Sequence, residues 1–242
     1  EPFTNYIGLG GPFPPAMPGN EPEPFFGSYS IRDIYEHAKD TDGKYTVPIL
    51  WDKKTETIVS NESAEIIRML NSEFNEFAKN PELDIYPEAQ RDAIHAVNDW
   101  VYPTINNGVY RCGFATSQQA YDKAIEELTE SFDRVESILS KQRYMAGDQF
   151  TEADVRLFVT LLRFDEVYVV YFKTNTRKVA NSPAILNYLR EIYQMPGVAP
   201  TVNMEQIKMH YFCSHPNLNR WSIIPKGDNF VEKLKEPHNR GD

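Results

Sequence analysis

Residues 147–158 read GDQFTEADVRLF, the stretch with the most specific local pattern in the chain. Thr151 and Asp154 stand at the spacing of a capping box, in which two residues satisfy each other's backbone N–H at a helix N-terminus, although Glu or Gln is usual at the second position. Phe150 and Val155 occupy the places where a hydrophobic staple packs. The pattern predicts a buried helix that starts directly after the threonine.

Apolar residues at helical spacing predict further helices on both sides of this stretch. The longest precedes it, with Ala124, Leu128 and Phe132 among its apolar positions. From residue 215 onward, polar residues and prolines predict an extended tail over the surface. The predicted helices span residues 88–101, ending before Pro103, then 117–140, 152–172 and 182–193.

The N-terminal part of the chain has a mixed pattern. Its first 27 residues are rich in glycine and proline, which predicts a loop that is unusually long for a compact domain. The next segment, residues 28–39, predicts a helix with Ser30 as its N-cap. The residues expected on one face of this helix are Ile31, Ile34, Tyr35 and Ala38.

A β-hairpin is predicted next. Residues 45–51 are apolar and β-branched and suit the first strand, residues 52–54 suit a turn, and residues 57–59 suit the second strand. Pro48 cannot donate to a ladder, so it marks an edge or a special backbone position. A helix is expected to open at residues 60–63. Its expected buried residues are Ala64, Ile66, Ile67, Met69 and Leu70.

Composition excludes several classes of protein. The chain has 242 residues, 41% of them hydrophobic, and a formal net charge of −10. That charge argues against a nucleic-acid surface, which needs clustered Lys and Arg. No apolar run approaches the roughly 20 residues that cross a bilayer. We expect no membrane association and a cytoplasmic protein, or an organelle-matrix protein if a targeting segment has been lost upstream of residue 1, which is not Met.

Several motifs along the chain carry a family resemblance. They are TVPILWDKK at 46–54, NESAEIIR at 61–68, NDWVYPTINNGVYR at 98–111, GFA at 113–115, RFDEVY at 163–168, YFK at 171–173 and IKMHY at 207–211. Together they resemble the glutathionyl-hydroquinone reductases, the Xi class of glutathione transferases. The resemblance covers roughly residues 30–225 and implies a partial thioredoxin-like domain over residues 1–80, followed by an all-helical domain over 81–242. It also implies a homodimer.

The resemblance implies a role for particular residues. Glutathione, as cosubstrate, would bind beside a cis-proline and at a helix N-terminus, where N–H groups and the helix dipole favour its γ-glutamyl carboxylate. Phenol rings would line the hydroquinone pocket and supply an O–H to the substrate. The implied glutathione residues are Val47, Pro48, Glu62 and Ser63, and the implied catalytic residues are Tyr110, Tyr168 and Tyr211.

The sequence departs from the family at the nucleophile. Family members carry a Cys-Pro-Trp motif between the first strand and first helix of the thioredoxin-like half, and its thiolate attacks the thioether sulfur. No such motif occurs in these 242 residues, and we expect several dozen residues to be missing near Pro15–Met17. Cys112 is expected to be a small buried side chain. Cys213 lacks neighbouring ligands for a metal, so no metal is expected.

Three functions stay open at this point. The first is glutathione-dependent reduction of glutathionyl-hydroquinones through a cysteine that is missing here. The second is a truncated, non-catalytic binding or scaffold protein with the same fold. The third is a conjugating transferase that uses Ser or Tyr chemistry, for which Tyr6 is a candidate.

Overall fold

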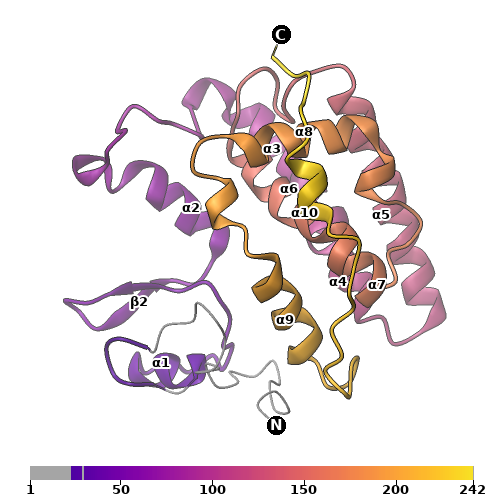
Figure 1. The fold of residues 1–242 in the computed structure, drawn as a ribbon. Helices are drawn as coiled ribbons and strands as arrows, with labels where there is room; N and C mark the ends of the chain where they lie inside the picture. Colours follow the sequence, from indigo (N-terminus) through magenta and orange to yellow (C-terminus); the bar gives the residue numbers. More distant parts are fainter. Residues whose placement is uncertain (1–22, 29, 242) are drawn as a thin grey trace. The chain divides into compact units, whose positions relative to one another are not determined.

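The computed structural model describes residues 23–28 and 30–241. Tyr6 and the expected gap at Pro15–Met17 therefore lie outside the described residues. The chain forms two compact units, one from residues 1–83 and 205–224 and the other from residues 84–204 and 225–242 (Figure 1). Both units are thus built from two separate stretches of the chain. No helix among the described residues is long and apolar enough to cross a membrane.

The first unit begins with α1 (Ile31–His37), and its predicted cap is confirmed. The Oγ of Ser30 accepts a hydrogen bond from the backbone N–H of Asp33, and the Asp33 carboxylate accepts from the backbone N–H of Ser30 at 2.8 Å. This reciprocal pair fixes the helix start. Ile34 and Tyr35 are buried, as the predicted apolar face requires.

The predicted hairpin is present but shorter than expected. Strands β1 (Leu50–Asp52) and β2 (Thr57–Ser60) pair antiparallel. Regular pairing begins only at Leu50, after the Val47–Pro48 peptide bond, which is cis. Since proline has no N–H to give to a ladder, the segment before it stays outside the sheet.

Helix α2 (Ser63–Ser72) starts at the predicted place, but the predicted burial of its apolar face is wrong. Leu70 is 60% exposed, and no residue of the helix is buried. Ala64, Ile66, Ile67 and Met69 are only partly covered. The described part of this unit contains a sheet of just two short strands, which offers too little apolar surface to cover a ten-residue helix. The unit also contains the short turn η1 (Asn75–Phe77) and most of α9 (Met204–Ser214), a helix that the sequence patterns did not predict.

All named elements in the described residues of the second unit are helices or helical turns, and an isolated β-bridge joins Tyr144 to Gly147. Predicted helices 117–140 and 182–193 are confirmed by α5 (Gln118–Leu139) and α8 (Pro183–Gln194). The other elements are η2 (Glu88–Gln90), α3 (Arg91–Val101), η3 (Tyr102–Asn106), α4 (Gly108–Gly113), α6 (Glu152–Arg163), η4 (Phe164–Tyr168), α7 (Val169–Tyr171), η5 (Val179–Asn181), η6 (Ala199–Thr201) and α10 (Phe230–Leu234). The long helix α5 contacts α4 and α8, while α3 contacts α6 and α10 contacts α8.

One helix prediction in this unit needs correction. The expected break before Pro103 does not occur, because the chain continues from α3 through a π-helical turn, η3, that contains the proline. Pro103 has no N–H to donate to the preceding turn. In that turn the Thr104 hydroxyl donates to the carbonyl of Trp100 at 2.6 Å. The predicted helix over residues 152–172 is confirmed as a helical run over 152–171, made of α6, η4 and α7, and its turn at η4 is π-helical.

The prediction of an extended tail is wrong at α10. Phe230 and Leu234 are buried, and the backbone N–H of Phe230 donates to Oε1 of Glu166 at 2.7 Å. Farther along, Arg240 donates from Nε to Oε2 of Glu191 at 2.8 Å. We call residues 225–241 the C-terminal strap, since these contacts tie it to the helices of the second unit.

The capping box that opened the sequence analysis is confirmed at α6. Asp154 is buried, and its Oδ2 accepts from the backbone N–H of Thr151 at 2.9 Å. Its Oδ1 accepts from the backbone N–H of Met145 and from the hydroxyl of Tyr188, each at 2.9 Å. Burial raises the pKa of Asp154, and these hydrogen bonds oppose that shift. One carboxylate therefore joins a loop, the start of α6 and the body of α8.

Replacing this carboxylate should destabilise the second unit strongly. Asp154→Ala leaves two buried backbone N–H groups and a buried hydroxyl without their acceptor, which costs roughly 3 kcal/mol or more in the free energy of unfolding. Asp154→Asn keeps one acceptor oxygen and should cost less. The measurement is urea unfolding, with Asp148→Ala, an exposed residue of the same loop, as the control. Equal stability of Asp154→Ala and the control would contradict this account.

Candidate functional site

The residues predicted to bind glutathione lie at two places in the first unit. Val47, before the cis peptide bond to Pro48, is 66% exposed. Glu62 is the N-cap of α2, where its carboxylate accepts from the backbone N–H of Ala64, and Ser63 is the first residue of the helix. Both Glu62 and Ser63 are exposed. The start of a helix favours a bound anion, and the Glu62 carboxylate suits an amine.

Hydrogen bonds below the helix start hold its backbone in place. The N–H of Glu62 donates to Oγ of Ser60 at 3.1 Å, and this hydroxyl donates to Oε2 of Glu65 at 2.9 Å. Ser60 is buried. The exposed carboxylate of Glu62 is therefore carried on a fixed piece of main chain.

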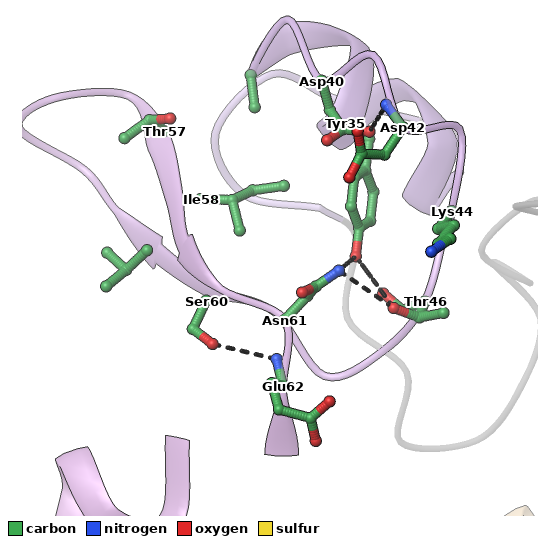
Figure 2. A pocket seen from close by; sticks show the side chains of 12 residues that line it. Tyr35, Asp40, Asp42, Lys44, Thr46, Thr57, Ile58, Ser60, Asn61 and Glu62 are labelled. Atoms are coloured by element: carbon green, nitrogen blue, oxygen red, sulfur yellow. Dashed lines mark hydrogen bonds between the residues drawn. The ribbon is translucent and has the colours of Figure 1, made fainter. Parts of the chain in front are cut away.

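A cavity of about 570 Å³ adjoins both places (Figure 2). It reaches Thr46, directly before Val47, and it reaches Glu62. Figure 2 shows the Tyr35 phenol directed at the side chain of Asn61 and at Thr46. The cavity walls are of mixed character, with carboxylates, one ammonium group and apolar carbons. Its lining residues are Tyr35, Ala38, Asp40, Asp42, Lys44, Thr46, Thr57, Ile58, Val59, Ser60, Asn61 and Glu62.

An aromatic cluster lies in the second unit and contains two of the three predicted tyrosines. The ring centroids of Tyr110 and Tyr168 are 6.1 Å apart. Phe172 lies against both, at 5.3 Å from Tyr110 and 5.5 Å from Tyr168. Phe114 stacks on Tyr110 and is 45% exposed, whereas Tyr168 and Phe172 are buried. The cluster thus has a buried base and an accessible edge.

Both tyrosines of the cluster lie in or close to π-helical turns. Tyr168 is the last residue of η4. Tyr110 belongs to α4, the helix that follows η3 after one residue. π-helical turns occur frequently at functional sites, because the wider turn redirects side chains. The acidic residues of η4 anchor it, since the Asp165 carboxylate accepts from the backbone N–H groups of Val179 and Ala180 at 2.7 and 2.9 Å.

The third predicted tyrosine, Tyr211, is a buried residue of α9 and belongs to the first unit. The ring of His210 meets it edge to face, with 5.3 Å between centroids. Within the second unit the structure brings Tyr110 and Tyr168 together, and Tyr211 is described in the first unit.

Neither cysteine is placed to act as a nucleophile. Cys112 is buried, as predicted, and burial raises the pKa of its thiol to about 11 against the opposing charges of Arg111 and Lys173. Cys213 is also buried, and burial raises the pKa of that thiol as well. Among the described residues, no group of His, Cys, Asp or Glu could hold a metal ion.

Sequence reasoning missed two kinds of residue at these places. Tyr35 was expected only to pack, and Asn61 was noted only as part of a motif, yet both line the cavity and bond to each other. The sequence could have pointed to Asn61, because it directly precedes Glu62, a predicted site residue. Phe114 and Phe172 were missed as partners of the tyrosines, although both lie inside the motifs that carry the family resemblance.

Comparison with known proteins gives consistent relatives. Residues 118–191 match the family model for the glutathione S-transferase C-terminal domain. The chain is 47% identical over 229 residues to glutathionyl-hydroquinone reductase YqjG of Escherichia coli, covering 94% of this chain and 69% of that protein. It is 42% identical over 214 residues to glutathionyl-hydroquinone reductase PcpF of Sphingobium chlorophenolicum, covering 87% of this chain and 68% of that one.

Solved structures agree with the sequence relatives. The glutathione-bound structure of YqjG superposes with a TM-score of 0.90, covering 95% of this chain and 74% of that one at 47% identity. Glutathione transferase Xi 1 from Trametes versicolor superposes with a TM-score of 0.84, covering 88% and 75% at 50% identity. The molecule therefore has the glutathione transferase fold, with a thioredoxin-like part and a helical part. Within that fold, the chain belongs to the glutathionyl-hydroquinone reductases, the Xi class.

Gly113 is predicted to be essential for the aromatic cluster. A Cβ at this position would overlap Cδ1 of Phe172, a buried ring, so Gly113→Ala must displace that ring and should cost about 1–3 kcal/mol of stability. Gly108→Ala in the same helix would place its Cβ 3.7 Å from Cδ1 of Leu128, an ordinary contact, and should be neutral or stabilising. Thermal unfolding checks both variants. A Gly113→Ala protein as stable as Gly108→Ala would refute the packing argument.

The Cys112 thiol should be inert at neutral pH. With a pKa of about 11, only about one molecule in a thousand carries the thiolate at pH 8. Iodoacetamide should label Cys112 in the native protein roughly a hundredfold more slowly than in denatured protein, and the rate should rise as the pH approaches 11. Peptide mass spectrometry measures the labelling. Rapid native labelling would reopen Cys112 as a nucleophile.

Proposed function

We propose that this protein takes part in the glutathione-dependent reduction of glutathionyl-hydroquinones. The observation that carries the proposal is that one compact unit holds two exposed residues of the family motifs, Val47 and the acidic N-cap Glu62. Relatives at 47% and 42% identity bear the name glutathionyl-hydroquinone reductase, and one was solved with glutathione bound. Glutathione is the proposed cosubstrate, and no metal takes part.

In this proposal residues 1–80 hold glutathione and residues 81–242 receive the aromatic ring. Val47 and Pro48 present backbone groups to the cysteinyl part of glutathione. Ser63 and the start of α2 bind the γ-glutamyl carboxylate, and Glu62 accepts from its amine. The rings of Tyr110, Tyr168 and Tyr211 contact the hydroquinone, and a phenol O–H supplies the proton that its ring carbon needs.

The proposed chemistry proceeds in two steps. A thiolate attacks the thioether sulfur of the conjugate, the bond from sulfur to the aromatic carbon breaks, and that carbon takes a proton as hydroquinone leaves. The resulting mixed disulfide is opened by a second glutathione, which gives oxidised glutathione and restores the thiol. The two cysteines of the sequence are both buried, so in this proposal the thiol belongs to a cysteine motif absent from these 242 residues.

A binding or scaffold protein without catalysis is the second candidate. The absence of the family's cysteine motif and the burial of Cys112 and Cys213 favour it for the chain as it stands. Nearly a third of YqjG lies outside its match to this chain, which covers 69% of that relative. This candidate predicts ligand binding without release of hydroquinone. For either candidate we propose a homodimer located in the cytoplasm.

Calorimetric titration with glutathione tests the shared part of both candidates. The chain should bind glutathione, and Glu62→Ala and Ser63→Ala should each weaken binding about tenfold through the loss of a charge-assisted or direct hydrogen bond. Glu76→Ala, an exposed carboxylate of the same unit, is the control and should leave the affinity unchanged. A wild-type chain that binds no glutathione would sink the proposal.

Chromatography of a glutathionyl-hydroquinone incubated with glutathione and the protein separates the two candidates. The 242-residue chain should bind the conjugate without releasing hydroquinone, whereas a form that carries the cysteine motif should release it. Turnover by the 242-residue chain would show that the assignment of the nucleophile is wrong.

A further inference from the structure

Three side chains in the first unit form one hydrogen-bonded group, which we call the Tyr35 clasp. The hydroxyl of Tyr35 donates to the backbone carbonyl of Thr46 at 2.8 Å. The side-chain amide of Asn61 donates from Nδ2 to the Tyr35 hydroxyl at 3.0 Å and to Oγ1 of Thr46 at 3.3 Å (Figure 2). The clasp joins α1, the segment before the cis-proline and the segment before α2.

The directions of these hydrogen bonds follow from the donors available. A phenol has one proton, and Tyr35 gives it to the carbonyl, which lacks a proton of its own. The same hydroxyl must then accept from Asn61, whose amide has two protons to give. An aspartate at position 61 has nearly the same size but no proton to donate, so the Tyr35 hydroxyl could bond to it only by turning its proton away from the Thr46 carbonyl.

The ring that carries the clasp is firmly held. Tyr35 is 2% exposed, and Tyr45 meets its ring edge to face, with 5.7 Å between centroids. Its backbone belongs to α1, whose start is fixed by the capping box of Ser30 and Asp33. A buried ring on a capped helix is a rigid anchor for the two loop segments that bond to its hydroxyl.

The clasp also fixes the direction of a peptide group that faces the proposed ligand. The carbonyl of Thr46 and the N–H of Val47 belong to one peptide unit, which is planar, and the cis bond falls only at the next one. In a trans peptide the N–H points opposite to the carbonyl. Because the Thr46 carbonyl points at Tyr35, the N–H of Val47 points away from the clasp.

We propose that Tyr35 and Asn61 are positioning residues for glutathione, acting through the Val47 peptide group and through Glu62, which directly follows Asn61. This inference rests on the proposed function. It adds that the Tyr35 clasp holds the segment of Val47 and the segment of Glu62 at a fixed separation. Neither side chain needs to touch the ligand. Their effect is to keep a backbone donor and an acidic N-cap in register before glutathione arrives, which lowers the ordering cost of binding.

Four variants test the clasp in the whole chain by calorimetric titration with glutathione. Tyr35→Phe removes the shared hydroxyl and Asn61→Asp removes both amide donors, so each should weaken binding roughly tenfold. Thr46→Val removes the hydroxyl that accepts the 3.3 Å bond from Asn61 and lies 3.4 Å from the Tyr35 hydroxyl, but it leaves the carbonyl bond, so its effect should be smaller. Tyr45→Phe is the matched control in the adjacent ring and should bind as the wild type does.

Backbone amide chemical shifts supply a readout that needs no ligand. Tyr35→Phe and Asn61→Asp should each shift the amide signals of both Val47 and Glu62, and Tyr45→Phe should shift neither. If the wild-type chain binds no glutathione, the proposed function fails, and these shifts still decide whether the clasp couples the two segments. Tyr35→Phe protein that is folded, binds glutathione with wild-type affinity and leaves both signals in place would overturn the inference.

Discussion

The helical unit depends on one buried carboxylate. Asp154 gathers the N–H of Met145, the N–H of Thr151 and the hydroxyl of Tyr188, which come from three separate stretches of the chain. A buried carboxyl group in such a place is tolerable because these partners donate hydrogen bonds to it. Helix α6 therefore has a fixed starting point, and η4, which continues from α6, inherits its position. The aromatic cluster is built on that continuation.

The two candidate places, one in each unit, are supported by the same kind of construction. In the helical unit, π-helical turns place Tyr110 and Tyr168 on one ring cluster, and Gly113 leaves the space that Phe172 fills. In the other unit, Tyr35 and Asn61 hold the loop before the cis-proline and the loop before α2. In both cases accessible residues, Phe114 in one unit and Val47 and Glu62 in the other, lie beside buried aromatic or polar side chains. A preorganised binding site in general needs rigid supports of this type.

Much of the fold could be predicted from the sequence because its signals are local. Ser30 and Thr151 indicate helix starts because each has its capping partner three residues later. Helix α5 could be predicted from the spacing of its own apolar residues. The failures have a different cause. A π-helical turn lets the chain pass Pro103, which a simple helix rule forbids, and the burial of α2 depends on surfaces that its own pattern does not report.

In the candidate site, too, the features set by neighbouring residues could be predicted and those set by distant contacts could not. The place of Glu62 at a helix start and the buried state of Cys112 were predictable from neighbouring residues. The bond between Tyr35 and Asn61 was not, since 26 positions separate them and only the folded backbone brings them together. Roles for Tyr110, Tyr168 and Tyr211 came from the family resemblance and not from periodicity.

The discontinuous make-up of both units bears on how the protein is made. Residues 205–224 complete the first unit, and the C-terminal strap completes the second, with Arg240 reaching back to Glu191. A ribosome delivers the chain from its N-terminus, and domains commonly fold in that order. Here the early half must wait for segments translated more than a hundred codons later. The first unit therefore cannot finish folding before residues 205–224 have been made, and until then its first stretch lacks the contacts that these residues supply.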